Sequence, residues 1–143
     1  MITGADHVNI TVASRDRAAA FLCQAFGFAE ERRFESDDPV QGVITGNPGA
    51  RVKVALLRLG ALRVGLVEFQ GEHALPASAP DIRRPGTPTL VFDTTDMDSD
   101  YARLQGMGVQ FRSAPQREAP FRVRIVQGVT PDGILFSLVQ RNA

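Results

Sequence analysis

The chain has 143 residues, of which 43% are hydrophobic and 22% are charged. These are ordinary values for one globular domain, and they exclude a disordered or low-complexity protein. The 16 basic and 16 acidic residues balance, so no net field attracts nucleic acid or an anionic membrane. No segment approaches the roughly 20 apolar residues of a membrane helix, and residues 1–6 lack a secretory signal. We therefore expect a cytoplasmic protein with neither nucleic-acid nor membrane partners.

The first element expected along the chain is a strand over residues 6–12. Val8, Ile10 and Val12 alternate there with polar residues, which gives the strand an apolar and a polar face. A helix follows. Ser14 is suited to cap its N-terminus, and Gly27 tolerates the positive φ of a C-terminal cap.

Three extended segments come next, over residues 28–35, 51–59 and 62–69, and Gly60 with Ala61 forms a tight hairpin between the last two. Residues 36–50 are rich in Asp, Gly, Pro and Asn, and they are too numerous for a simple hairpin turn. The sequence predicts a long loop there, acting as a lid or rim. The first half therefore has the order strand, helix, three strands.

The same order returns after a linker over residues 70–86, which contains three prolines and no strand or helix period. A strand at residues 89–92 precedes a helix that Asp96 caps and Gly108 ends. Strands are expected over residues 109–112, 121–127 and 134–140, and the last two are joined by the turn at residues 130–133.

The two halves superpose when the second is shifted by 82 positions, which places Thr89 on His7 and Asp96 on Ser14. Repeats of this length are duplicated supersecondary units that share a core. Three consecutive strands without a helix favour antiparallel pairing. We expect an α+β fold in one domain over residues 1–143. Its first module is residues 5–69, the linker is residues 70–86, and its second module is residues 87–140.

The chain resembles the vicinal oxygen chelate superfamily, the group of glyoxalase I, bleomycin-resistance proteins, methylmalonyl-CoA epimerase and extradiol dioxygenases. The resemblance spans essentially the whole chain, and residues 6–10, 65–69 and 131–138 carry it, together with the helix ends at residues 25–28 and 104–109. It implies two β-α-β-β-β modules that form a U-shaped, mostly antiparallel eight-stranded sheet around a cleft. It also implies a homodimer, which the open sheet edges favour as well.

The resemblance further implies four metal ligands, contributed by the first and last strands of the two modules. His7 and Glu68 match the first two ligand positions, whereas the third and fourth are occupied by Thr89 and Ser137. Catalytic metal sites generally need about three protein ligands. The ligand set is therefore incomplete. The sequence predicts no firm cofactor and at most a weakly bound divalent metal, held by His7 and Glu68.

Period-two alternation along four strands predicts the residues that line the cleft. The expected lining combines apolar side chains with a few polar groups, as small-molecule sites do. It consists of His7, Asn9 and Thr11, then Val64, Leu66 and Glu68, then Thr89, Val91 and Asp93, and finally Leu135, Ser137 and Val139.

His7 and Glu68 are also the candidate catalytic residues. A carboxylate among apolar neighbours needs a partner, and a Glu68–His7 pair could abstract a proton next to a carbonyl. The same pair could instead be a hydrogen-bonded polar contact that only recognises a ligand.

The leading hypothesis is a small-molecule-binding protein of the glyoxalase/bleomycin-resistance type with an incomplete metal site. The alternative is a glyoxalase- or epimerase-like lyase or isomerase that transfers a proton on a carbonyl substrate, with or without a metal. A third hypothesis is that the protein is a pure interaction module.

Overall fold

The computed structural model describes residues 1–142, which fall into two compact units with the division between Ala77 and Ser78. The boundary lies within the expected linker. Each unit is described by itself. None of the helices in the described part of the chain is long and apolar enough to cross a membrane.

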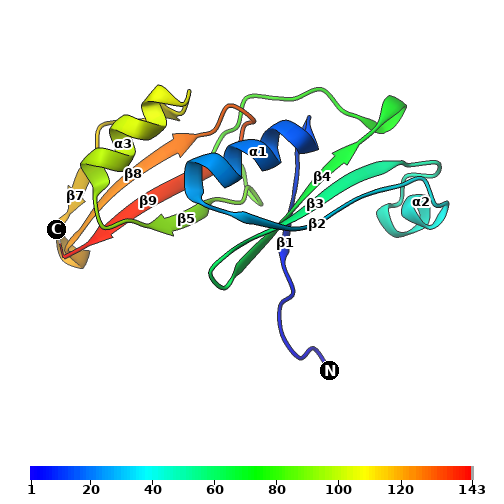
Figure 1. The fold of residues 1–143 in the computed structure, drawn as a ribbon, viewed down its shortest axis with the longest axis horizontal. Coiled ribbons are helices and arrows are strands. Elements are labelled where there is room, and N and C mark those ends of the chain that lie inside the picture. Colours follow the sequence, from blue (N-terminus) through cyan, green and yellow to red (C-terminus); the bar gives the residue numbers. More distant parts are fainter. Residues whose placement is uncertain (143) are drawn as a thin grey trace. The chain divides into compact units, whose positions relative to one another are not determined.

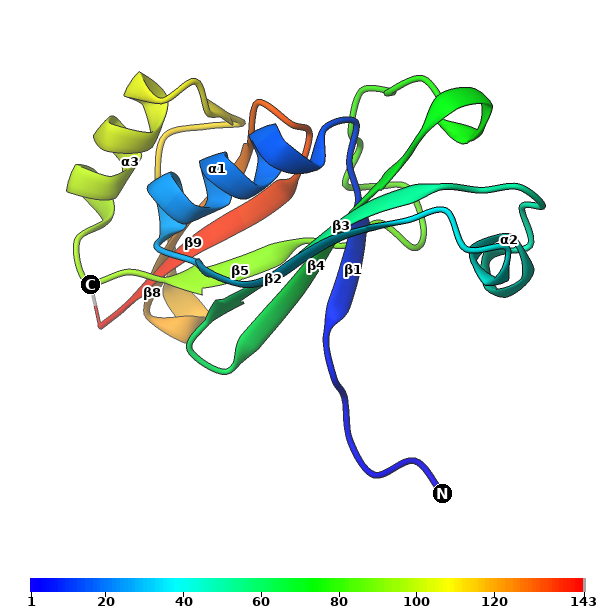
Figure 2. The same ribbon diagram turned by 45° about the vertical axis from the view of Figure 1, so that its right-hand side comes forward.

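The first unit contains one four-stranded sheet in the order β1-β4-β3-β2. Strand β1 runs parallel to β4, and the other neighbours are antiparallel (Figure 2). The elements are β1 (Val8–Thr11), α1 (Arg15–Phe26), β2 (Ala29–Ser36), α2 (Val40–Thr45), β3 (Val52–Leu59), β4 (Leu62–Phe69) and the 3₁₀ turn η1 (Gly71–His73).

Helix α1 covers one face of this sheet (Figure 1). Its ends are those that the sequence predicts. The Ser14 hydroxyl accepts a hydrogen bond from the Arg17 backbone N–H at 3.2 Å, and Gly27 closes the helix at φ 83°. The buried stripe of α1 packs against β3 and β4, and no side chain in this core is more than 2% exposed: Ala18, Leu22 and Ala25 on the helix, and Ala55, Leu57, Val64 and Leu66 on the strands.

The second unit contains a five-stranded sheet in the order β5-β9-β8-β6, with β7 also paired to β8. Strand β5 runs parallel to β9, as β1 does to β4, and the other pairs are antiparallel. The elements are β5 (Leu90–Asp93), α3 (Met97–Gly106), β6 (Gln110–Phe111), β7 (Gln116–Glu118), the 3₁₀ turn η2 (Ala119–Phe121), β8 (Val123–Val129) and β9 (Leu135–Arg141).

The α+β class is confirmed, and the first module has the expected β-α-β-β-β order. The second module follows the same order but has one additional short strand, β7 (Gln116–Glu118), so the described residues contain nine strands rather than the eight expected. Two further details differ from the prediction. Residues 36–50 contain the short helix α2, whose six residues are too few to show a helical period. The strand expected from Phe121 begins only at Val123, because Phe121 lies in η2 and Arg122 has a positive φ of 51°.

Candidate functional site

The face of the first sheet that α1 leaves uncovered carries a cluster of polar side chains at the edge strand β1. In the parallel register, Asn9 lies opposite Gly65 of β4. A Cβ atom at Gly65 would lie 2.0 Å from Asn9 Oδ1 and 3.1 Å from His7 Cδ2. Asn9 and His7 therefore lie over Gly65, on the side opposite its neighbours Val64 and Leu66, which are buried on the face that α1 covers. We call this uncovered side the open face.

Charged groups fix the ring of His7 on the open face. Its Nδ1 lies 2.5 Å from Asp6 Oδ2, and Arg63 Nη1 donates to Asp6 Oδ1 at 3.1 Å. The hydrogen bond with His7, followed by the charge of Arg63, lowers the pKa of the Asp6 carboxyl. An ionised carboxylate only accepts hydrogen bonds, so Nδ1–H of His7 is the donor of this contact, and in a neutral ring Nε2 would be the acceptor.

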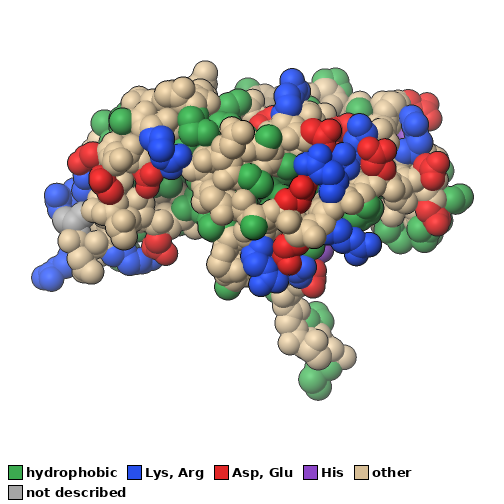
Figure 3. All heavy atoms as spheres, viewed as in Figure 1, with side chains coloured by type: hydrophobic (Ala, Val, Ile, Leu, Met, Phe, Trp, Pro, Cys, Tyr) green, Lys and Arg blue, Asp and Glu red, His purple; other side chains and the backbone are tan. Residues whose placement is uncertain are grey.

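The arginine of this network is itself held in place. Arg63 Nε donates to Glu31 Oε1 at 3.0 Å, and Arg58 Nε lies 3.2 Å from the same oxygen. Hydrogen bonds from Arg58 and then from Arg63 lower the pKa of Glu31. Charged side chains of both signs are thus linked across the sheet, from Asp6 before β1 to Glu31 on β2. Figure 3 shows basic and acidic side chains interspersed over the visible surface.

The middle of the open face is apolar. The antiparallel register places Val54 opposite Val67 and Leu56 opposite Gly65, and Phe34 of β2 lies opposite Val54. The three aliphatic side chains are partly exposed, and Phe34 is 36% exposed. An apolar floor beside a polar edge is the combination that small-molecule recognition uses.

Glu68 lies on the other side of the sheet from His7. Its Oε1 accepts a hydrogen bond of 2.7 Å from the backbone N–H of Arg15, in the first turn of α1. Glu68 alternates in phase with Val64 and Leu66, both 0% exposed beneath the helix. These three residues were expected in one cleft with His7, Asn9 and Thr11, and the structure places the two sets on opposite faces of the sheet.

The difference arises from the register of β1 against β4. Val8 pairs with Val64 and Thr11 with Val67, so the odd-numbered residues of both strands share the open face. Alternation within one strand does not show which of its faces lies beside which face of the neighbouring strand. Shifting the pairing of the two strands by one residue would move every side chain of one strand to the other face of the sheet.

The first unit does not fit the expected pair of metal ligands. The Glu68 carboxylate is committed to the N-terminus of α1, and the β4 position next to His7 is Gly65, which has no side chain. Within residues 1–142, no three His, Cys, Asp or Glu side chains are grouped so that they could hold a metal ion. His7 alone is too few ligands for a stable site.

The predicted residues of the second unit share one face of its sheet. Val91 pairs with Ser137 in the parallel register of β5 and β9, and Leu135 alternates in phase with Ser137. Val91 is 60% exposed, whereas Ser137 and Leu135 are 3% and 6% exposed. Thr89 is half-buried and immediately precedes β5.

The sequence reasoning missed Asp6, Arg63 and Gly65 as parts of the polar cluster. A glycine inside a strand pattern often marks a close approach of another group to the backbone. Gly65 carried that signal, because it lies between the apolar residues Val64 and Leu66.

Comparison with known proteins agrees with this architecture. The model of the Glyoxalase/Bleomycin resistance protein/Dioxygenase superfamily matches residues 4–138. No curated protein matches the chain.

Solved structures show similarity at the level of the fold. A glyoxalase family protein from Bacillus cereus is 24% identical with a TM-score of 0.86, and the match covers 100% of this chain and 97% of that one. Another similar structure is a mutant of the fosfomycin resistance protein FosX from Listeria monocytogenes, complexed with Mn(II) and 1S,2S-dihydroxypropylphosphonic acid. It is 17% identical with a TM-score of 0.64, and the match covers 96% of this chain and 90% of that one. A glyoxalase I mutant from Zea mays is 20% identical with a TM-score of 0.68, covering 96% of this chain and 45% of that one.

Proposed function

The chain belongs to the Glyoxalase/Bleomycin resistance protein/Dioxygenase superfamily, and from that premise we propose that it is a small-molecule-binding protein. The ligand lies on the open face of the first sheet. The observation that carries the proposal is the placement of His7 and Asn9 over Gly65, beside the apolar floor of β3 and β4.

Each part of this face has a role in recognition. Val54, Leu56 and Val67 supply apolar contact, while the Asn9 amide and the Thr11 hydroxyl supply exposed hydrogen-bonding groups at the edge. The chemistry of the face fits an uncharged or weakly polar molecule with a carbonyl or hydroxyl group.

The experiment compares ligand-induced stabilisation between variants. A panel of small carbonyl and hydroxy compounds is added to wild-type protein, and a compound that raises the melting temperature in a saturable way is selected. Asn9→Ala should abolish that rise while the unliganded melting temperature stays unchanged, since Asn9 is exposed. Arg17→Gln, an exposed change on α1 in the same unit, is the matched control. Full stabilisation of the Asn9→Ala protein would place the binding site elsewhere.

A second function is favoured by the Asp6–His7 hydrogen bond. Asp6 orients the ring through Nδ1, so a neutral His7 ring would use Nε2 to accept a proton from carbon next to a carbonyl. The alternative is therefore a lyase or isomerase of the glyoxalase or epimerase type. His7, rather than Glu68, is its base.

Two variants separate the functions. In an enzyme, His7→Gln lowers kcat for enolisation of a bound carbonyl compound and leaves its affinity nearly unchanged. Asp6→Asn does the same more weakly and shifts the pH profile. In a protein that only binds, wild type shows no solvent-proton exchange into the bound compound, and that result would exclude the catalytic alternative.

We also propose that the protein forms a homodimer. Strand β1 is the edge strand of its sheet, and it has one hydrogen-bonded neighbour, β4. Unprotected edges of this kind favour association. Sedimentation at several concentrations tests the assembly, and a single monomeric species at all of them would refute it.

A further inference from the structure

The contact between Asn9 and Gly65 determines which end of the Asn9 amide faces outwards on the open face. A Cβ atom at Gly65 would collide with Asn9 Oδ1, and the Asn9 Cγ atom lies 3.2 Å from the same position. In glycine a hydrogen atom points in the direction that Cβ takes in other residues. The Asn9 oxygen therefore lies over a Cα–H bond of Gly65.

This contact suits the oxygen of the amide and not its nitrogen. Cα–H groups between adjacent strands form weak hydrogen bonds to oxygen atoms. The amide nitrogen carries two hydrogens and has no acceptor lone pair, so in the reversed orientation hydrogen would face hydrogen. The missing side chain of Gly65 thus holds the Asn9 amide with its oxygen against the sheet.

With the oxygen held in this way, the Asn9 amide presents Nδ2 to the outside of the open face. Asn9 is exposed, and within residues 1–142 no group accepts a hydrogen bond from Nδ2. The apolar floor formed by Val54, Leu56 and Val67 lies on the same face. A ligand that covers the floor and Nδ2 together has to accept a hydrogen bond, because covering a donor without pairing it costs free energy.

On the basis of the proposed function, we infer that Asn9 is the specificity-determining residue of the open face and that Gly65 is its positioning residue. Asn9 Nδ2 donates a hydrogen bond to a ligand oxygen that only accepts hydrogen bonds. The ligand class is a ketone or ester carbonyl attached to an apolar body that covers the floor. Compounds that present only donors, such as alkylammonium ions, bind more weakly because they leave Nδ2 unpaired.

The first experiment determines the orientation of the amide by NMR on the full chain without ligand. We expect no NOE between the Nδ2 hydrogens of Asn9 and the α-hydrogens of Gly65. A strong NOE between these groups would place the nitrogen against the sheet. That result would overturn the inference and leave the proposed function standing.

The second experiment titrates two probes of similar shape, cyclohexanone and cyclohexylamine, and follows them by NMR at neutral pH. Cyclohexanone only accepts hydrogen bonds, whereas the protonated amine only donates them. Wild type should bind cyclohexanone more tightly. Asn9→Asp keeps the shape but removes the donor, so it should weaken cyclohexanone binding at least about fivefold, the loss expected for one hydrogen bond. The same variant should bind the ammonium ion more tightly than wild type does, which a merely structural role of Asn9 would not produce.

Two further variants complete the comparison. Gln24→Glu makes the same exchange of amide for carboxylate at an exposed position of α1, and it should bind both probes as wild type does. Gly65→Ala no longer leaves room for the Asn9 oxygen, so the preference for cyclohexanone over the ammonium ion should fall. Circular dichroism and the melting temperature verify that each variant is folded.

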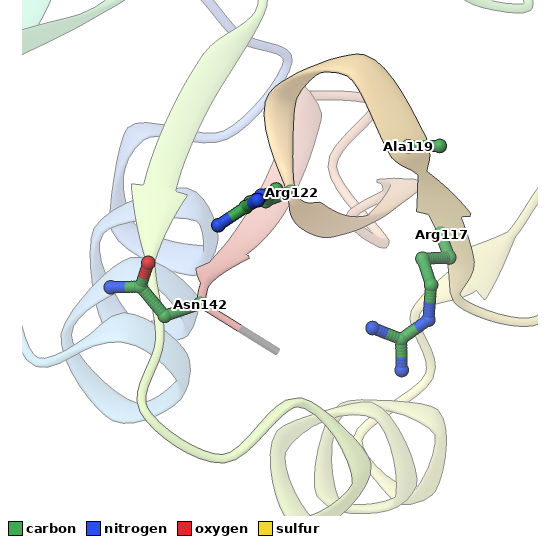
Figure 4. A pocket seen from close by; sticks show the side chains of 4 residues that line it. All are labelled: Arg117, Ala119, Arg122 and Asn142. Atoms are coloured by element: carbon green, nitrogen blue, oxygen red, sulfur yellow. The ribbon is translucent and has the colours of Figure 1, made fainter.

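The place of binding is read from the residues whose signals shift. The second unit has a hollow lined by Arg117, Ala119, Arg122 and Asn142 (Figure 4), where a small probe could also bind. Shifts at Ala119 and Arg122 in place of Asn9 would overturn the inference. Equal affinity of wild type for the two probes, or unchanged cyclohexanone binding in Asn9→Asp, would overturn it and leave binding on the open face intact. Failure of both probes and of the whole compound panel to bind would overturn the inference together with the proposed function.

Discussion

Replacing Glu68 with alanine should destabilise the protein rather than disable a reactive group. The Glu68 carboxylate accepts a 2.7 Å hydrogen bond from the first backbone N–H of α1, one of the donors that a helix leaves unsatisfied at its start. A hydrogen bond to a charged group contributes about 1.5–3 kcal/mol. Because Glu68 is partly exposed, we expect a loss of about 1.5 kcal/mol in the free energy of unfolding, at the lower end. For a chain of this size, this corresponds to a fall in melting temperature of roughly 3–6 °C.

Glu68→Gln separates charge from hydrogen bonding. Glutamine retains an acceptor oxygen but loses the favourable interaction of a negative charge with the helix N-terminus, about 0.3–1 kcal/mol. Urea denaturation of wild type, Glu68→Gln and Glu68→Ala should therefore give decreasing stability in that order. Glu72→Ala, an exposed glutamate of the same unit, is the control and should match wild type. If Glu68→Ala were as stable as wild type yet had lost ligand binding, Glu68 would belong to the binding site and the face assignment would be refuted.

Three further changes test other parts of the structure. Gly65→Ala places a methyl group 2.0 Å from Asn9 Oδ1; the exposed amide rotates away, so stability falls by less than about 1 kcal/mol while ligand affinity, measured by titration, drops. Burial alone would raise the pKa of Asp100, but hydrogen bonds from Thr94 and Arg103 lower it overall. The ionised Asp100 therefore stabilises the fold fully above its unfolded pKa of about 4, and this stabilisation is lost as pH falls through its lower folded pKa. In acid unfolding, the stability of Asp100→Asn should depend less on pH than that of wild type. Adding nickel, zinc, cobalt or manganese to purified protein should raise its melting temperature by less than about 1 °C, and one tightly held ion per chain would contradict the ligand geometry.

The element order could be predicted from the sequence because its signals are local. Ser14 and Asp96 accept hydrogen bonds from backbone N–H groups in the first turns of α1 and α3, and Gly27 ends α1 with a positive φ. Capping depends on residues within a few positions of one another. The hairpin between β3 and β4 is equally local. Helix α2 was missed, since six residues between turn-forming segments give no measurable period.

The shared face of three residues on β1 could be predicted from the sequence. His7, Asn9 and Thr11 lie together on the open face, as their alternation on one strand requires. Asp6, which orients His7, is its neighbour in the sequence. Arg63 is distant in the sequence, and its contact with Asp6 follows only from the pairing of β1 with β4. Glu68 was assigned to the wrong face for the same reason.

The sequence by itself determined the two-module order, the helix ends and the alternating faces of each strand, because these depend on neighbouring residues and backbone geometry. Only the tertiary structure decided which face of β4 meets which face of β1, because strand register is set by long-range pairing and by the packing of α1 on Val64 and Leu66. That register turns Glu68 towards the helix and leaves Gly65 beneath Asn9 and His7.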